Sequence, residues 1–120
     1  MIRVTLYRED DRLKGFCVSG HAGYGEEGED IICSAVSALT VNCVNSIEAL
    51  TGAAMFVTEE EDGGYLEMVL QDDQSEGAQL LLESLALGLT SIESTYGSGY
   101  IKVENGPCPE QDRDESGSEE

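Results

Sequence analysis

The sequence predicts an α+β domain in which two helices pack on one face of a mixed or antiparallel sheet. Five short apolar-rich segments have the character of strands, and two longer segments repeat apolar residues at helical spacing. Their order is ββαββαβ, so hairpins dominate and a helix follows each pair of strands. This order favours helices gathered on one side of the sheet, whereas strict alternation of strand and helix would favour a parallel sheet.

The N-terminal residues predict a hairpin. Residues 2–7 alternate between apolar and polar side chains, which is the pattern of a half-buried strand. The sequence EDDR at 9–12 is a polar turn, and residues 15–19 form the returning strand. That strand delivers the chain to Gly20 and to His21, the only histidine in the sequence.

A glycine-rich loop and a long helix follow. Residues 22–29 hold three glycines and three glutamates, which predicts a flexible loop. Asp30 is the predicted N-cap of a helix that runs to about Leu50, where Gly52 provides the C-terminal stop. The core-facing stripe of this helix comprises Ile32, Ala35, Val36, Leu39, Cys43, Ile47 and Leu50. Its flank carries Cys33, Ser37 and Thr40.

The second half of the chain repeats the plan of the first. Residues 54–58 and 65–70 predict a second hairpin, and the turn EEEDGG between them supplies glycines for positions of positive φ. Residues 72–76 lead into a second helix that ends near Gly97, and a last strand covers 100–104. The core-facing stripe of that helix comprises Ala78, Leu82, Leu85, Leu89, Ile92 and Tyr96.

Two features lie outside this predicted core. Leu80 and Leu87 project to the opposite face of the second helix, where a monomer would expose them. From Gly106 onward the chain is polar and acidic, with nothing to bury, so we expect it to be disordered. The predicted organisation is one domain over residues 1–105 and a disordered acidic tail over 106–120.

The composition is that of a globular chain with an unusual charge. The 120 residues are 40% hydrophobic, which is ample for one domain with a core. The 25 acidic and 6 basic residues give a formal net charge of −19. Such a charge repels nucleic acid and attracts a basic partner, although haloadaptation or solubility alone also explains it.

The sequence also supports predictions about the location of the protein in the cell and about metal ions and cofactors. No segment approaches the roughly 18 apolar residues that span a membrane, and the N-terminus has no leader pattern, so we expect a cytoplasmic protein. The four cysteines should therefore be reduced. Because there is no CxxC pair and only one histidine, we expect neither a metal site nor a cofactor.

Cys33 and His21 form a candidate catalytic pair. A cysteine attacks as its thiolate, which a helix N-terminus and a nearby imidazolium both favour. Cys33 lies at the predicted helix start and His21 ends the strand beside it, so the two side chains can meet across the loop. The imidazole would act as base to the thiol and later as acid to the leaving amine.

Neighbouring residues would complete such a site. Asp30 either caps the helix or orients His21, and Ser37 either hydrogen-bonds in the site or allows close packing. Free backbone N–H groups near Cys33 and Ser34 would cradle an oxyanion. A mobile lid over the substrate would contain Tyr24, Gly25 and Gly28.

A simpler interpretation stands beside the catalytic one. A lone cysteine near a helix start is usually a small buried hydrophobe, and a lone histidine on a loop is usually solvated. Among the other cysteines, Cys17 is predicted to face away from or beside the sheet core, Cys43 to lie in the core, and Cys108 to be inert in the tail.

The stretch GHAGYGEEGEDIICSAVSAL, residues 20–39, resembles the signature of the ribosomal-processing cysteine proteases, the Prp family. That signature reads GHA-x-Y/F-x-x-x-G-x-DIVCAAVSAL. This chain has Ile32 in place of Val and Ser34 in place of Ala, and neither change touches a reactive group. The order of strands and helices is also similar, so the likeness covers residues 1–105.

The resemblance implies a cysteine endopeptidase that uses Cys33 and His21, with Asp30 and Ser37 at further site positions. It implies that the substrate is the N-terminal extension of the bacterial ribosomal protein bL27. It also implies a homodimer, in which the outward leucines would find a partner, and a loop that orders on substrate binding. The matching loop residues are Gly20, Ala22, Gly23, Tyr24 and Gly28. The acidic tail is not a feature of the family.

Two other functions compete with the protease hypothesis. One is a non-catalytic module whose acidic surface binds a basic ribosomal protein, with the Cys/His pair incidental. The other is a thiol redox sensor, which requires a resolving cysteine, and the chain has no CxxC pair to supply one.

Overall fold

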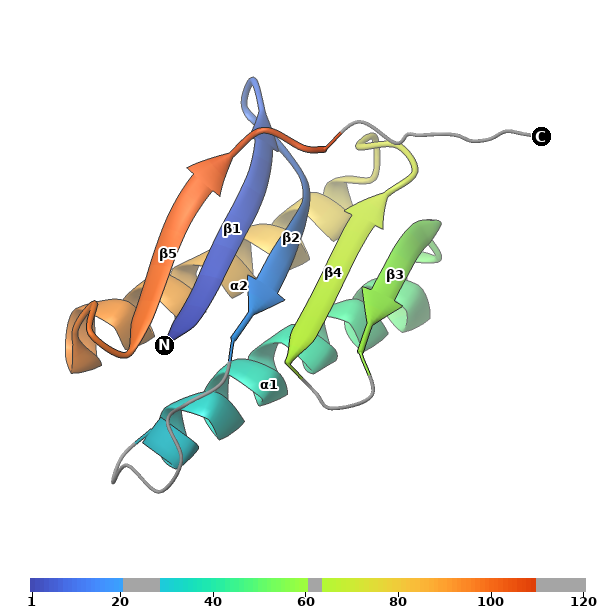
Figure 1. Ribbon diagram of the computed structural model, residues 1–120. Helices are drawn as coiled ribbons and strands as arrows, with labels where there is room; N and C mark the ends of the chain where they lie inside the picture. The colour runs from blue at the N-terminus through green and yellow to red at the C-terminus, as the bar shows by residue number, and fades with distance from the viewer. Residues whose placement is uncertain (21–28, 61–63, 110–120) are drawn as a thin grey trace.

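The computed structural model describes residues 1–20, 29–60 and 64–109 (Figure 1). The elements follow the predicted order ββαββαβ. They are β1 (Ile2–Glu9), β2 (Arg12–Ser19), α1 (Glu29–Ser46), β3 (Met55–Glu59), β4 (Tyr65–Leu70), α2 (Glu76–Tyr96) and β5 (Ile101–Gly106).

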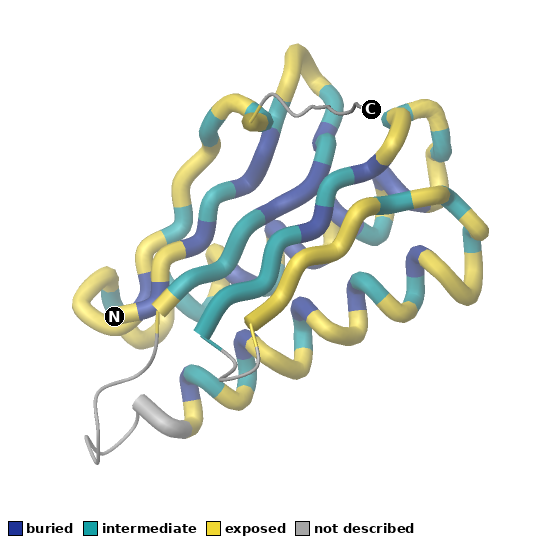
Figure 2. The backbone as a smooth tube through the Cα atoms, turned by 45° about the vertical axis from the view of Figure 1, so that its right-hand side comes forward, coloured by how far each residue is buried: buried dark blue, intermediate teal, exposed yellow. Residues whose placement is uncertain are grey.

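The strands form one mixed sheet in the order β3-β4-β2-β1-β5. All neighbours are antiparallel except β1 and β5, which run parallel because α2 carries the chain back across the sheet between β4 and β5. Both helices lie on the same face of the sheet (Figures 1 and 2). The predicted fold class is therefore confirmed.

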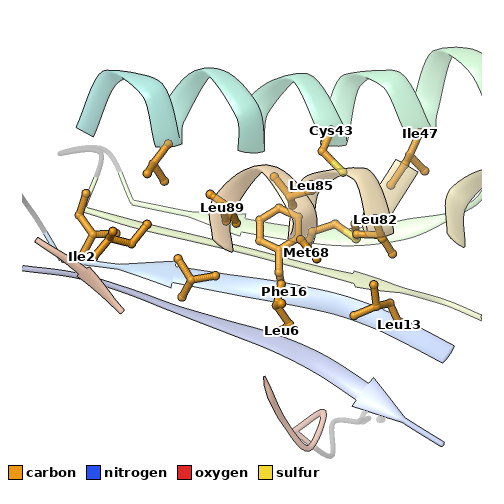
Figure 3. Packing of buried hydrophobic residues seen from close by; sticks show 14 of the residues in the cluster. Ile2, Leu6, Leu13, Phe16, Cys43, Ile47, Met68, Leu82, Leu85 and Leu89 are labelled. Atoms are coloured by element: carbon orange, nitrogen blue, oxygen red, sulfur yellow. The ribbon is translucent and has the colours of Figure 1, made fainter. Parts of the chain in front are cut away.

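The hydrophobic core lies between the sheet and the two helices (Figure 3). Side chains alternate across each strand, so every second residue points toward the helices. Phe16 of β2 and Met68 of β4 are completely buried at the centre of this layer. The helices contribute Ile32, Val36, Cys43 and Ile47 from α1, and Ala78, Leu82, Leu85, Ala86 and Leu89 from α2.

The start of α1 differs from the prediction. The helix begins at Glu29, so Asp30 lies inside it and the prediction that Asp30 is the N-cap is wrong. Acidic residues are favoured in the first turn as well as at the cap, because both positions face the free N–H groups of the helix N-terminus. The acidic residue Asp30 therefore correctly indicated that a helix starts nearby, but the helix begins one residue earlier, at Glu29.

The end of α1 shifts the helical phase. After Ser46 the chain makes a wider, π-helical turn over Ile47–Thr51, and the N–H of Gly52 donates to the Ile47 carbonyl at 3.1 Å. Gly52 has a φ of 69°, and it ends the helix as predicted. The wider turn rotates later residues off the core-facing stripe. Leu50, predicted to be in the core, is consequently 75% exposed.

By length and composition, the segment Ile31–Thr51 would suffice to cross a membrane, contrary to the sequence-based expectation. A core helix of a globular protein passes the same test. In this fold one side of the segment packs into the core shared with the sheet and α2. Length and composition therefore do not make it a membrane span.

α2 follows the prediction closely. The Ser75 hydroxyl accepts a hydrogen bond at 3.1 Å from the backbone N–H three residues later, which caps the helix. Leu80 and Leu87 are 71% and 70% exposed, as predicted. Tyr96 is the last residue of the helix and is half exposed, so its assignment to the core was wrong.

Strand boundaries differ by a few residues. β2 begins at Arg12, before the predicted start at residue 15, and β5 extends to Gly106. The strand therefore includes the residue at which the predicted tail begins. Residues 107–109 have no regular structure, and the predicted disorder of the remaining tail falls on residues outside the described part of the chain.

Candidate active site

Gly20 fixes the position at which the predicted substrate loop leaves the sheet. Its N–H donates to the Gly64 carbonyl at 3.0 Å, which ties the end of β2 to the start of β4. Its φ is 99°, and a Cβ at this position would lie 2.3 Å from the Met1 carbonyl oxygen. Glycine is therefore required here for both backbone conformation and space. His21 is the next residue in the chain.

Cys33 is positioned by the N-terminal part of α1. It is the fifth residue of the helix and follows Ile32, which is completely buried. The Cys33 side chain is half-buried and packs against the margin of the core. The thiol is thus held by the helix without being sealed beneath the sheet, as a nucleophile requires.

Cys43 shows what a purely structural cysteine looks like in the same helix. Its side chain is buried in the core, and its Sγ lies 3.7 Å from the Leu81 carbonyl oxygen as a donor. Burial raises the pKa of this thiol to about 11. Cys43 therefore stays protonated at neutral pH and is unsuited to nucleophilic attack, which confirms its predicted place in the core.

Cys17 lies on the face of the sheet that the helices leave uncovered, paired with Glu67 of β4. It is partly exposed and faces two tyrosines of that surface. Interaction with the Cys17 thiol raises the pKa of Tyr65, and burial together with a hydrogen bond to Glu67 raises the pKa of Tyr7. The predicted position of Cys17 outside the helix-covered core is confirmed.

Ser37 lies one turn after Cys33 on α1 and is exposed, so the two residues share one flank of the helix. Thr40, predicted to continue that flank, is buried instead. Its hydroxyl donates to the Val36 carbonyl at 2.9 Å, which satisfies the group without water. The accessible flank therefore narrows to Cys33 and Ser37.

The remaining predicted site residues fall outside what the structure describes. These are His21, Ala22, Gly23, Tyr24, Gly25 and Gly28. Asp30 has a described backbone position in α1. The described residues thus place the two ends of the loop, Gly20 and Glu29, at the end of β2 and the start of α1 (Figure 1).

The β3–β4 hairpin borders this region, a position that depends on long-range strand pairing and was not predicted from the sequence. Its closing residues Glu60 and Tyr65 are joined by a hydrogen bond of 3.1 Å, and Gly64 accepts the bond from Gly20. Glu59 and Glu60 are exposed at the end of β3. No lysine or arginine occurs anywhere between residues 15 and 101. The charged residues of this hairpin are therefore all acidic.

A separate pocket of about 270 Å³ lies between α2 and the β1–β5 edge. It contains the ion pair of Arg8 and Glu83, whose atoms approach to 3.0 Å, and Leu87 lies at its wall. None of the predicted site residues that the structure describes lines this pocket. Arg8 also donates to Asn105 at 3.0 Å, so the pair serves to join α2 to β5.

Comparison with protein families gives a match over residues 1–102 to the family described as cysteine protease Prp. Among characterised relatives, the chain is 34% identical over 101 residues to the ribosomal processing cysteine protease Prp of Bacillus subtilis. That alignment covers 80% of this chain and 90% of the relative.

Solved structures give the same result. Two structures of the essential ribosomal processing protease Prp from S. aureus superpose with TM-scores of 0.80 and 0.81, at 29% and 28% identity. Each alignment covers 88% of this chain and all of the other. One of those proteins is in complex with a covalently linked product peptide and the other with a substrate peptide.

Proposed function

The chain belongs to the cysteine protease Prp family, and on that basis we propose that it is a cysteine endopeptidase that removes the N-terminal extension of ribosomal protein bL27. The observation that carries the proposal is the position of Cys33. It is held near the N-terminus of α1 at the margin of the core, half-buried, while Cys43 of the same helix is sealed in the core.

In the proposed mechanism His21 takes the proton of the Cys33 thiol, and the thiolate attacks the carbonyl carbon of the scissile peptide bond. The C–N bond breaks, and the imidazolium returns its proton to the leaving amine. Water, activated by the same imidazole, then hydrolyses the thioester and restores the thiol. Backbone N–H groups at the start of α1 bind the oxyanion in both steps.

The same proposal gives a role to each of the supporting residues. Asp30 lies in the first turn of α1 and orients His21, and Ser37 lies one turn beyond Cys33 on the same flank. Gly20, Ala22, Gly23, Tyr24 and Gly28 form the substrate loop, which closes over an extended peptide. Gly20 anchors that loop through its bond to Gly64.

We further propose that the protein acts as a cytoplasmic homodimer. The exposed Leu80 and Leu87 lie two turns apart on the outer face of α2 and would be covered by the second copy. The acidic surface suits a ribosomal protein as client, because ribosomal proteins are basic and opposite charge favours encounter.

The test is cleavage of the full-length bL27 precursor, followed by mass spectrometry of the products. We expect Cys33→Ala and His21→Ala to abolish cleavage while the circular dichroism spectrum is unchanged. Cys17→Ala is the matched control, since it removes a partly exposed thiol elsewhere, and should cleave at the wild-type rate. Cleavage by Cys33→Ala at the wild-type rate would refute the proposal. Binding of the precursor without cleavage by the wild type would favour the non-catalytic acidic module.

A further inference from the structure

The two edge strands of the sheet, β5 and β3, differ in whether their outward backbone groups are hydrogen-bonded. At the β5 edge, the outward N–H of Val103 donates to the Glu93 carboxylate of α2 at 3.0 Å. Lys102 adds an exposed charge beside it. Blocking a free edge with a side-chain acceptor and a lysine is the usual protection against unwanted strand pairing. The β5 edge is thus closed.

The β3 edge has no such protection. The Ala54 carbonyl accepts from Gln71 at 2.9 Å, and the Glu60 N–H donates to Tyr65 at 3.1 Å. In an antiparallel ladder every second residue bonds to the neighbouring strand, so the even-numbered residues of β3 face β4. The odd-numbered residues, Met55, Val57 and Glu59, direct their N–H and C=O groups outward. Within the described residues, these outward groups have no hydrogen-bond partner.

The side chains along this strand are also open to solvent. Phe56 is 61% exposed and Val57 is 44% exposed, and the exposed surface follows most of the strand (Figure 2). β3 contains no proline and no lysine, the residues that most often discourage pairing at an edge, and its one charged side chain is Glu59 at its end. An apolar, unblocked edge of this kind is suited to accept one more strand.

The edge leads toward the candidate active site. β3 runs from Met55 to Glu59 and ends at the hairpin whose far side, Gly64, is bonded to Gly20. Gly20 in turn is where the chain departs toward α1 and Cys33. A strand added to β3 would therefore emerge at the end of the sheet from which the substrate loop arises (Figure 1).

The charges favour a basic occupant over a second copy of the chain. Glu48 lies in the turn before β3, and Glu59 and Glu60 end it, all three exposed. The strand, its hairpin partner β4 and α1 contain no lysine or arginine. Two copies pairing through this edge would bring the exposed carboxylates of both chains against one another, whereas a basic peptide would be attracted to them.

We propose that the β3 edge holds the substrate polypeptide as an added strand, with basic side chains of the substrate beside Glu59 and Glu60. This inference rests on the proposed protease function and specifies how its substrate is held. Backbone hydrogen bonds to Met55, Val57 and Glu59 would supply affinity that is independent of sequence, and the two glutamates would select basic segments.

The sharpest test is Val57→Pro. Proline removes the outward N–H and obstructs an added strand, but position 57 gives no hydrogen bond to β4, so the hairpin remains paired. Val57→Thr is the matched control, because it loses the apolar side chain and keeps the N–H. We expect Val57→Pro to lower kcat/KM for the bL27 precursor about tenfold, mainly through KM, and Val57→Thr to change it less than about twofold.

A short peptide that spans only the cleavage point separates this inference from the protease function. Its hydrolysis by Val57→Pro should match that of the wild type. If the wild type cleaves neither substrate, the protease proposal fails; if it cleaves both and Val57→Pro equals Val57→Thr on the precursor, only the β3 inference fails. Glu59→Gln should raise KM for the precursor, while the control Glu104→Gln on β5 should not.

Hydrogen exchange covers the case in which Val57→Pro does not fold. In Cys33→Ala bound to the uncleaved precursor, the amides of Val57 and Glu59 should exchange at least about tenfold more slowly than in the free protein. Unchanged exchange at both amides would overturn the inference. Protection of these amides in the free protein, lost on dilution to a monomer, would also overturn it by assigning the edge to a second copy.

Discussion

Cys33 and Cys43 lie on the same helix, ten residues apart in sequence, and their surroundings differ. Cys43 sits in the apolar core, and burial raises the pKa of its thiol to about 11. Cys33 sits in the second turn from the N-terminus, at the margin of the core. There the side chain is only partly buried, so solvent and a substrate can reach it.

Thiol labelling tests this contrast without any knowledge of the substrate. In the native protein at pH 6, iodoacetamide should label Cys33 faster than Cys17 and should leave Cys43 unlabelled. The measurement is peptide mapping of the alkylated sites over time. After unfolding in urea, all of the cysteines should react at similar rates. Labelling of Cys33 no faster than Cys17 would favour the binding-module interpretation.

Tyr7 has a buried hydroxyl group on the face of the sheet that the helices leave uncovered. It is only 5% exposed, and its hydroxyl donates to the Glu67 carboxylate at 2.6 Å. Burial is the larger cause of the raised pKa of Tyr7, and the bond to Glu67 adds to it. The folded state therefore holds this phenol in its protonated form at pH values where the unfolded chain has lost the proton.

Tyr7→Phe should lower the free energy of unfolding at pH 7 by about 1–2 kcal/mol, since a hydrogen bond to a charged acceptor is lost. Because the folded pKa of Tyr7 is raised above the unfolded value of about 10, its contribution is complete below pH 10 and declines as the pH rises further. Urea titrations at pH 8 and pH 11 check both parts. The difference between wild type and variant should shrink at pH 11, and a constant or growing difference would contradict the assignment.

Single residues were predictable from the sequence where a local rule applies. The exposed Leu80 and Leu87 and the buried Cys43 follow from helical spacing alone. The burial of Thr40 did not follow from helical spacing, because it depends on the hydrogen bond from its hydroxyl to the Val36 carbonyl and on the packing of the helix. The bond between Tyr7 and Glu67 links residues sixty apart in sequence and depends on the β1–β2–β4 register, which no local pattern reveals.

At the scale of elements, Gln79 joins α2 to β2. Its Oε1 accepts from the Leu13 N–H at 2.8 Å, and its Nε2 donates to the Leu13 carbonyl at 2.7 Å. Leu13 lies beside a register shift in the β1–β2 ladder and beyond the part of β2 that pairs with β4. The amide side chain therefore satisfies two backbone groups that the sheet leaves open, in a buried place.

Gln79→Leu should destabilise the protein by about 2–4 kcal/mol, because two buried backbone groups lose their partners. Gln71→Leu, at an exposed position before α2, is the control and should stay within about 0.5 kcal/mol of wild type. Urea denaturation followed by circular dichroism measures both. A loss under 1 kcal/mol for Gln79→Leu would show that water replaces the amide and would contradict this account.

The existence and order of the helices and strands were predictable from the sequence, but the residues at which they end were harder to predict. Helical spacing and the glycines at 52 and 97 correctly placed both helices along the chain. The π-helical turn that exposes Leu50 has no signal of its own in the residues around it. The strand order, which sets β3 at one edge and β5 at the other, depends on long-range pairing and came only from the structure.

At the scale of the whole molecule, the basic residues and the exposed leucines of α2 fall in different parts of the sequence. Of the six basic residues, four lie in the first hairpin region up to Lys14, and residues 15–101 have none. Leu80 and Leu87 stand out on α2 within this otherwise acidic chain. Apolar side chains so exposed on one helix face suit an interface with a second copy.

The double substitution Leu80→Ser/Leu87→Ser should convert a homodimer into a monomer, as measured by sedimentation equilibrium. The stability of each monomer should change little, because both side chains are already exposed. Leu50→Ser is the matched control, since Leu50 is similarly exposed in the π-helical turn that follows α1. A wild-type monomer, or a dimer that survives the double substitution, would contradict the proposed interface.

The most direct measurement is to locate the covalent intermediate. The wild-type protein is mixed with the bL27 precursor, quenched in acid within one turnover, digested and mapped by mass spectrometry. We expect a substrate fragment attached as a thioester to the peptide that contains Cys33, and no such fragment in either Cys33→Ala or His21→Ala. A fragment attached to Cys17, or cleavage that proceeds with Cys33→Ala, would contradict it.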